Sequence, residues 1–229
     1  MQRFREIWWI RHGESLGNAG ARTREPGTYS LTQRGFDEAG RLANWFERRP
    51  SLIVTSTFTR SRETAAPVIA RHCDTPVVEW PVHEISFLAP HRCIDTTQVE
   101  RRTLAQEFWS RWDPEFADGT GAESFSGFMS RVSDSLDRAR HCSEPFVAVF
   151  THAQFMRGII WRVLNPTAVI NSEAMRMFYE FSHGVPVPNC SILPMLIAED
   201  GSAFVGPIHA PIGDAENAAT VEHIRLSGL

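Results

Sequence analysis

The sequence predicts an α/β protein, a three-layer α/β/α sandwich around a mainly parallel central sheet. Short apolar runs alternate along the chain with longer segments in which apolar residues recur at helical spacing. A chain of 229 residues is long enough to bury the core of one such domain. No internal repeat or low-complexity linker divides the chain, so we expect a single domain over residues 1–229.

Each expected strand is a short apolar run, and the run Phe146–Phe150 is the strongest of them. Each expected helix has inward apolar positions three or four residues apart, and Thr32 is placed to cap the first helix. The turn signal Glu199-Asp200-Gly201 separates the last two strands. The expected strands are 6–10, 52–54, 77–78, 146–150, 191–198 and 203–208. The expected helices are 31–46, 60–72, 100–112, 124–141 and 155–164.

Composition excludes several classes of function. The net charge of −4 provides no basic field for nucleic acid or an anionic membrane, and no apolar run approaches membrane-spanning length. We therefore expect neither a nucleic-acid partner nor a membrane partner. All 23 basic residues are arginine, which excludes a Walker A phosphate loop, a pyridoxal Schiff base and a lysine nucleophile. Positive charge directed at a ligand must come from guanidinium groups, whose planar fork suits phosphate or carboxylate.

Cysteine usage predicts a protein of a reducing compartment. The four cysteines form no CxxC pair, so neither a structural zinc site nor a disulfide framework is expected. The first residues contain no long apolar signal core, and 42% hydrophobic with 22% charged residues is ordinary for a globular protein. A cytoplasmic location is the expectation that follows.

Reactive side chains follow three of the expected strands. Arg11 and His12 follow the first strand, Arg60 opens the helix after the second, and His152 follows the strand 146–150. In doubly wound sheets the ligand binds outside the carboxyl ends of the strands, so these groups are expected at one edge. Two guanidiniums and two imidazoles from three separate strand ends predict a pocket for a phosphate-like dianion.

These segments resemble, in order, the motifs of the histidine phosphatase superfamily, the phosphoglycerate-mutase-like proteins. Together they span residues 7 to about 165, and they are specific as a set, whereas the Arg-His-Gly triplet alone is not. Thr57 stands where the family usually has proline, and Ala153-Gln154 replaces a common small or glycine pair. The matching segments are Arg11-His12-Gly13-Glu14 with Asn18, Leu31-Thr32-Gln33-Arg34-Gly35, Ser56 to Ala65, His83-Glu84-Ile85 and Thr151-His152.

The resemblance implies catalysis through a phosphohistidine, with no metal and no cofactor. His12 would be the nucleophile, and Arg11, Arg60 and His152 would bind the phosphoryl oxygens and stabilise the charge that develops. Glu84 would protonate the leaving group and then activate water. Ser15 would either contact substrate or cap its own loop. The positions expected to bind substrate are Arg11, Asn18, Arg60, His152, Ser15 and Ala153.

The expected function is hydrolysis of a small phosphorylated metabolite. A phosphomutase is the first alternative, but the tryptophan-asparagine pair of the glycolytic mutases is replaced here by Gly17-Asn18, and their long basic insert has no clear counterpart. A phosphate-binding module without catalysis is the second alternative. A metal-dependent hydrolase using His12, His83, Glu84 and His152 is the third, and no HExxH or HxH spacing supports it.

Two segments are left with open interpretations. Residues from about 86 to 122 are rich in aromatic residues and arginine and exceed a simple connection. The resemblance implies that this insertion covers the substrate, whereas helical spacing predicts a packed helix pair with Phe108, Trp109 and Trp112 in the core. The tail 215–229 is expected to be either disordered or a partner contact.

Overall fold

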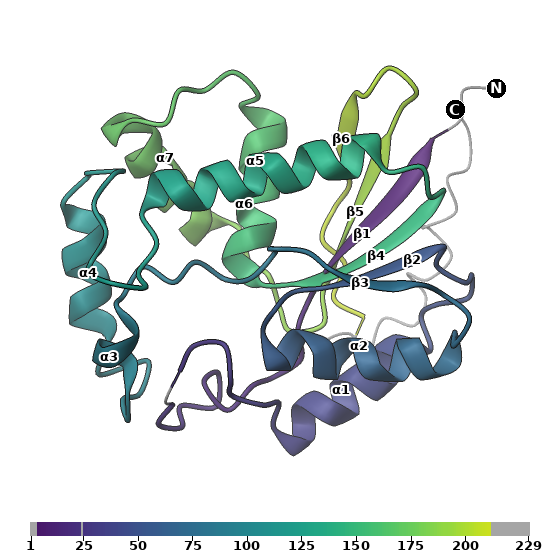
Figure 1. The fold of residues 1–229 in the computed structure, drawn as a ribbon, viewed down its shortest axis with the longest axis horizontal. Helices are drawn as coiled ribbons and strands as arrows, with labels where there is room; N and C mark the ends of the chain where they lie inside the picture. Colours follow the sequence, from purple (N-terminus) through teal and green to yellow (C-terminus); the bar gives the residue numbers. More distant parts are fainter. Residues whose placement is uncertain (1–3, 24, 212–229) are drawn as a thin grey trace.

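A computed structural model describes residues 4–23 and 25–211, and it shows a six-stranded sheet between two layers of helices (Figure 1). The strand order is β3-β2-β4-β1-β5-β6. Strands β3, β2, β4 and β1 are parallel, whereas β5 runs antiparallel to β1 and β6 antiparallel to β5. The predicted mainly parallel α/β sheet is thus confirmed. The strands are β1 Arg5–Arg11, β2 Leu52–Thr55, β3 Val77–Glu79, β4 Phe146–Thr151, β5 Ile192–Ile197 and β6 Ala203–Val205.

The helices cover both faces of the sheet. In Figure 1, α1 and α2 lie on one face and α5, α6 and α7 on the other, while α3 and α4 lie to the left, beyond the end of the parallel strands. No helix of the described part of the chain is long and apolar enough to span a membrane. The helices are α1 Gln33–Ala43, α2 Thr59–Arg71, α3 Pro90–Cys93, α4 Arg102–Ser110, α5 Phe125–His141, α6 Ala153–Leu164 and α7 Ser172–Gly184.

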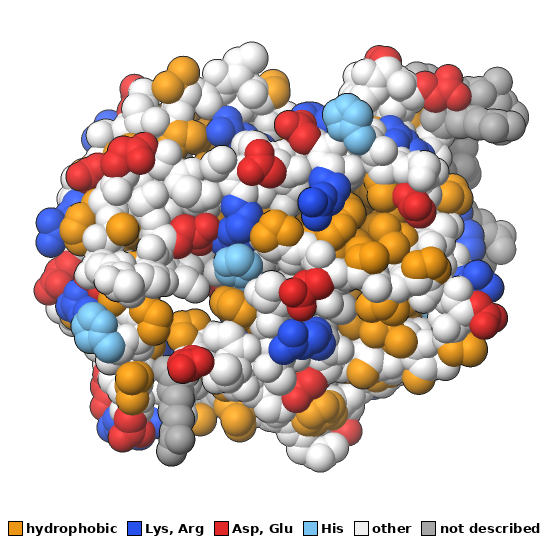
Figure 2. All heavy atoms as spheres, in the orientation of Figure 1, with side chains coloured by type: hydrophobic (Ala, Val, Ile, Leu, Met, Phe, Trp, Pro, Cys, Tyr) orange, Lys and Arg blue, Asp and Glu red, His pale blue; other side chains and the backbone are white. Residues whose placement is uncertain are grey.

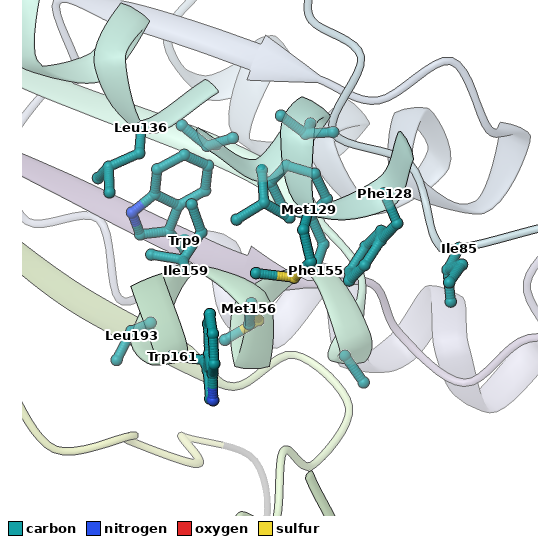
Figure 3. Packing of buried hydrophobic residues seen from close by; sticks show 14 of the residues in the cluster. Trp9, Ile85, Phe128, Met129, Leu136, Phe155, Met156, Ile159, Trp161 and Leu193 are labelled. Atoms are coloured by element: carbon teal, nitrogen blue, oxygen red, sulfur yellow. The ribbon is translucent and has the colours of Figure 1, made fainter. Parts of the chain in front are cut away.

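The alternation of side chains along β1 divides the core into two clusters. Trp9 packs on the α5–α6 face with Phe128 and Phe155, as Figure 3 shows for these buried side chains. The next residue, Ile10, points to the opposite face and packs with Leu42 of α1. Both faces are therefore apolar, as expected for a strand buried between two helical layers. The strand ends are held at fixed positions by this packing.

Helix termini follow the capping residues of the sequence. The Thr32 hydroxyl accepts a hydrogen bond from the Gly35 amide (3.1 Å), which confirms Thr32 as the N-cap of α1. Ser124 caps α5 in the same way, through the amide of Gly127. Helix α4 ends before the predicted Trp112 because Trp112 has φ 48°, in the left-handed region that a helix does not continue through.

The structure differs from the expectations in several places: helix α1 ends at Ala43 instead of residue 46, and the short helix α3 was not predicted. Helix α7 was not predicted, although its buried residues Ala174, Met175, Phe178 and Ser182 recur at helical spacing. Strand β6 ends at Val205 instead of residue 208, and Pro207, which has no N–H, follows two positions later. The tail 215–229 lies outside the described residues.

The segment 86–122 carries α3 and α4 and is anchored in the core. Phe108 and Trp109 of α4 are buried, with their rings 5.3 Å apart and nearly perpendicular. Trp109 also packs on Phe178 of α7. The expected core role of these aromatic residues is confirmed, and α4 is fixed on one side while its other side remains exposed.

Candidate active site

The ends of β1, β2 and β4 lie side by side and bring the predicted reactive groups together. Arg11 pairs with Thr151 in the parallel register, so the residues that follow them, His12 and His152, are neighbours. Their ring centroids are 5.0 Å apart. Arg60, from the first turn of α2, donates from Nε to His12 Nε2 at 3.1 Å. Groups from three strand ends therefore share one buried site.

The hydrogen bonds of His12 fix its tautomer. Nδ1 lies 2.7 Å from the carbonyl oxygen of Gly13, which can only accept, so Nδ1 carries the proton. Nε2 then has a free lone pair, and this lone pair accepts the bond from Arg60. The imidazole is 4% exposed. Burial, followed by the positive charges of Arg60 and Arg11, holds the pKa of His12 well below its ordinary value. The ring is neutral and its Nε2 is nucleophilic at neutral pH.

His152 is completely buried and is oriented by Ser56. The Ser56 hydroxyl lies 2.8 Å from His152 Nε2 and accepts a bond from the amide of Phe58. The Ser56 hydroxyl therefore accepts from Phe58 and donates its own proton to His152 Nε2. Since Nε2 accepts, the proton of the neutral His152 ring is on Nδ1. Nδ1 is buried and has no partner among the described residues. Burial and nearby arginine charge also hold the pKa of His152 well below its ordinary value.

Arg60 is buried, with only 3% of its surface exposed, and neighbouring groups hold its guanidinium in place. Its Nη1 donates to the carbonyl of Pro26 at 2.7 Å. Its guanidinium carbon lies 4.6 Å from the ring centroid of Tyr29 and 4.8 Å from that of Phe58. A buried arginine without a salt bridge in the described chain is costly, and an anionic ligand would compensate for this cost.

Arg11 and Glu84 complete the charged groups around the site. Arg11 donates from Nη1 to the carbonyl of Val187 at 2.5 Å, and its buried Nε has no partner among the described residues. Both carboxylate oxygens of Glu84 lie near the amide of Gln154 (3.1 and 3.2 Å), in the first turn of α6. The negative charge of Glu84 raises the pKa values of Arg11 and Arg157 against the lowering caused by their burial. The carboxylate therefore lies among the arginines.

The loop that carries Glu84 is fixed from α5. Arg131 donates from Nη1 to the carbonyls of Pro81 (2.8 Å) and His83 (2.7 Å). It also forms a bidentate salt bridge with Glu123, through Nε at 2.9 Å and Nη2 at 2.7 Å. On the other side of the loop, Phe58 packs on the ring of His83 at 5.1 Å. Burial lowers the pKa of His83 to about 4, so this ring is a neutral neighbour of the site.

The loop after β1 requires two glycines. The Gly13 amide donates to Thr64 Oγ1 at 3.0 Å, and a Cβ on Gly13 would lie 2.7 Å from the carbonyl oxygen of Gly35. Gly35 in turn approaches the backbone of Glu14 so closely that any side chain would overlap it. The Glu14 carboxylate accepts from the Thr32 hydroxyl at 2.8 Å. Glu14 therefore joins the nucleophile loop to α1.

The remaining predicted substrate positions differ in what they offer a ligand. The Ser15 hydroxyl is buried and donates to Asn18 Oδ1 at 3.0 Å, which favours the loop-cap interpretation, while its contact with substrate stays a prediction. Asn18 is exposed, and its oxygen also lies 3.4 Å from the amide nitrogen of Asn189, which leaves its own amide group free for a ligand. Ala153 is the first residue of α6, beside His152.

A cavity of about 440 Å³ opens next to these groups. In Figure 2 a hollow is visible on the left of the molecule, between the side formed by α3 and α4 and the part that holds the sheet. Pro26 and Tyr29, which hold Arg60, line one wall, and Ile85, which follows Glu84, lines another. Within residues 4–23 and 25–211, no group of three His, Cys, Asp or Glu side chains is arranged to hold a metal ion.

Several residues of the site were not identified from the sequence. Ser56 lies one position after β2, and the strand-end rule that selected His12 would also have selected it. Arg157 lies one helical turn after Ala153, on the helix that begins at the site, so helical spacing was the available signal. Arg131 had no sequence signal, because α5 approaches the Glu84 loop only through the tertiary fold.

The sequence matches the histidine phosphatase superfamily (branch 1) over residues 7–205. A metal-independent phosphoserine phosphatase of Arabidopsis thaliana is 29% identical over 166 residues, which are 69% of this chain and 68% of that protein. The alpha-ribazole phosphatase of Shigella flexneri superposes with a TM-score of 0.69 at 21% identity, over 90% of this chain and 96% of that one. The phosphoserine phosphatase of Entamoeba histolytica, in complex with 3-phosphoglyceric acid, has a TM-score of 0.66 at 19% identity, with coverages of 90% and 96%. The two structural matches show the shared fold.

Proposed function

This chain belongs to the histidine phosphatase superfamily, branch 1, and on that premise we propose that it hydrolyses a small phosphomonoester through a phosphohistidine at His12. The observation that carries the proposal is the state of His12. Its ring is neutral, its Nδ1 proton is fixed on Gly13, and its Nε2 lone pair points at Arg60. A nucleophilic nitrogen held against a buried guanidinium is suited to attack on a phosphorus atom.

Binding of the phosphoryl group uses the donors that the described chain leaves unused. The phosphoryl oxygens accept from His152 Nδ1 and Arg11 Nε, both buried and without a protein partner. Arg60 Nε exchanges its bond to His12 Nε2 for one to a phosphoryl oxygen, which frees the lone pair for attack. Asn18 adds its amide from the exposed rim. These charges need no metal ion to neutralise the dianion.

Two steps then complete hydrolysis. Glu84 takes up a proton when the anionic substrate binds. His12 Nε2 then bonds to phosphorus while the bond to the ester oxygen breaks, and Glu84 gives this proton to the departing alkoxide. The Glu84 carboxylate next takes a proton from water, whose oxygen bonds to phosphorus as the phosphorus–nitrogen bond breaks. Inorganic phosphate leaves, and both His12 and Glu84 return to their starting protonation states.

Rapid quenching during turnover of a labelled aryl phosphate tests this mechanism. We expect label on the protein in an acid-labile, alkali-stable linkage at His12, formed in the presence of excess EDTA. His12→Ala should remove both the label and the release of phosphate while the protein stays folded, since His12 lies in a loop after β1. Label on a serine or an aspartate, or activity that requires an added metal, would refute the proposal.

A pair of substrates tests the role of Glu84. Glu84→Gln should reduce the hydrolysis of an alkyl phosphate about 10²–10⁴-fold, because a poor leaving group needs the proton. An aryl phosphate with a good leaving group should lose far less. Equal losses for the two substrates would mean that another group is the acid.

A further inference from the structure

We infer that the alcohol released from the substrate is a bulky, largely apolar group that ends in a carboxylate or another anion, and is not an amino acid. This inference rests on the proposed function. It is drawn from the cavity of about 440 Å³ beside the phosphoryl site and from Arg102, whose side chain is the one unpaired cation among the described residues of the cavity wall.

The cavity begins where the leaving group departs. Pro26 accepts the bond from Arg60, and Tyr29 packs on the same guanidinium, so one wall is continuous with the phosphoryl-binding groups. Ile85, on another wall, directly follows the proton donor Glu84. An ester whose oxygen lies between Arg60 and Glu84 therefore directs the rest of the molecule into this cavity. A space of this size accommodates a group considerably larger than a three-carbon alcohol.

Apolar residues are somewhat more than half of the described residues that line the wall, and none of the described lining residues is an aspartate or glutamate. An ammonium group placed here would lose water and find no carboxylate partner, which costs free energy. The wall thus disfavours the zwitterionic head of an amino acid and favours an aromatic or aliphatic body. The apolar lining residues are Pro26, Tyr29, Ile85, Phe87, Leu88, Val99 and Ala105.

Arg101 and Arg102 are the arginines among the described residues of the cavity wall, and of these two only Arg102 has a side chain without a protein partner there. Arg101 donates from Nη1 to the carbonyl and the hydroxyl of Thr96 (both 2.7 Å) and to the Thr23 hydroxyl (3.2 Å), so it holds the wall together. The side chain of Arg102 is exposed and makes no hydrogen bond or salt bridge with the described residues.

Arg102 lies at the junction of two spaces. It lines the cavity of about 440 Å³ and also an adjoining one of about 300 Å³, which Gln106 and Trp109 of α4 line as well. Arg102 is also the first residue of α4, where its charge opposes the helix dipole and is better compensated by an anion. It is the group positioned to bind an anion at the far end of the leaving group.

Matched phosphate esters test this inference on the full-length protein. Ethyl, benzyl, para-carboxybenzyl and para-(aminomethyl)benzyl phosphate release alcohols of similar reactivity, so kcat/KM reports recognition. We expect benzyl phosphate to exceed ethyl phosphate by roughly 10–100-fold, from burial of the ring. The carboxylate should add about five-fold at low ionic strength, and the amine should remove a similar factor. The carboxylate effect should shrink as salt is added.

Arg102→Gln should abolish the preference for the carboxylate, measured as the ratio of kcat/KM for para-carboxybenzyl phosphate to kcat/KM for benzyl phosphate. Arg41→Gln is the matched control, because Arg41 is exposed on α1, on the opposite side of the sheet from α5 and α6. The inference is overturned if the aminomethyl ester is the best substrate, if ethyl phosphate equals benzyl phosphate, or if Arg102→Gln retains the carboxylate preference. Hydrolysis without this ranking leaves the proposed function intact, whereas absence of phosphate release from every ester refutes the proposed function and the inference with it.

Discussion

Replacing Gly35 by alanine tests whether the nucleophile loop depends on close approach to α1. A Cβ at this position would lie 2.0 Å from the carbonyl oxygen of Glu14, whereas real Cβ atoms essentially never come within 3.0 Å of another atom. The two backbones must therefore separate by about 1 Å, the difference between these distances. The obstacle is backbone, so no side chain can rotate away to relieve the overlap.

The expected cost follows from the contacts that this separation weakens. The Thr32 amide donates to Glu14 O at 2.9 Å and the Thr32 hydroxyl to Glu14 Oε1 at 2.8 Å. Each such bond contributes about 0.5–1.5 kcal/mol, overpacking costs about 1–3 kcal/mol, and the better helix propensity of alanine returns about 0.5–1 kcal/mol. We expect Gly35→Ala to lower the free energy of unfolding by about 2–4 kcal/mol. A chain of this size should then melt roughly 5–15 °C lower.

Gly40→Ala provides the matched control on the same helix. Gly40 is exposed, and a Cβ there meets nothing within 4 Å. This variant should be about 0.5–1 kcal/mol more stable than the natural protein, because only helix propensity changes. Calorimetry and phosphate release should be measured on both variants. A 1 Å displacement of His12 is expected to cost Gly35→Ala about 10²-fold in kcat. If the two variants melt together and turn over equally, the reasoning about this contact is wrong.

Three further predictions concern groups that orient the reacting residues. Arg131→Gln should lower the free energy of unfolding by about 2–4 kcal/mol, since it leaves the half-buried carboxylate of Glu123 unpaired. It should also lower kcat more for alkyl than for aryl phosphates, because the Glu84 loop loses its support. An equal loss of kcat for both kinds of ester would mean that Arg131 has a purely structural role. Ser56→Ala should lower the free energy of unfolding by only about 1 kcal/mol. It should weaken competitive inhibition by inorganic phosphate at least five-fold, because Ser56 no longer orients His152. Unchanged inhibition would contradict this role of Ser56. The folded-state pKa values of His12 and His152 lie below those of the unfolded chain, so the unfolded state binds more protons and stability falls as the pH drops through about 6.5 toward 5. Each histidine contributes at most about 1.4 kcal/mol of unfolding free energy per pH unit. Urea unfolding at several pH values should show that the free energy of unfolding depends less steeply on pH in His152→Gln than in the natural protein. An equal dependence on pH would refute the assignment.

The sequence predicted those parts of the fold that depend on local pattern. The run Phe146–Phe150 and the cap Thr32 were correctly placed because burial and capping leave periodic signals. The strand-end rule also brought His12 and Arg60 to one edge, as their contact shows. Helix α7 was missed although the spacing of Ala174, Met175 and Phe178 provided a helical signal.

The remaining features of the site depend on contacts between distant segments. Arg131 holds the Glu84 loop from 47 residues away in the chain, and Tyr29 packs on Arg60 from a connecting loop. Neither contact has a local pattern. Ser15 was ambiguous for the opposite reason, since a serine in such a loop can bond to its own backbone neighbours or to a ligand, and only coordinates distinguish the two.

The two residues to which we assign the proposed reaction are held from opposite faces of one sheet. His12 is positioned by a loop wedged against α1, and Glu84 by a guanidinium on α5. In the proposed mechanism, loosening either helical layer alone would separate His12 Nε2, the attacking atom, from the acid Glu84, even while the other layer remains intact. Turnover should therefore depend on the packing of both layers. On mild heating, activity should be lost before the helical circular-dichroism signal of the whole protein decreases.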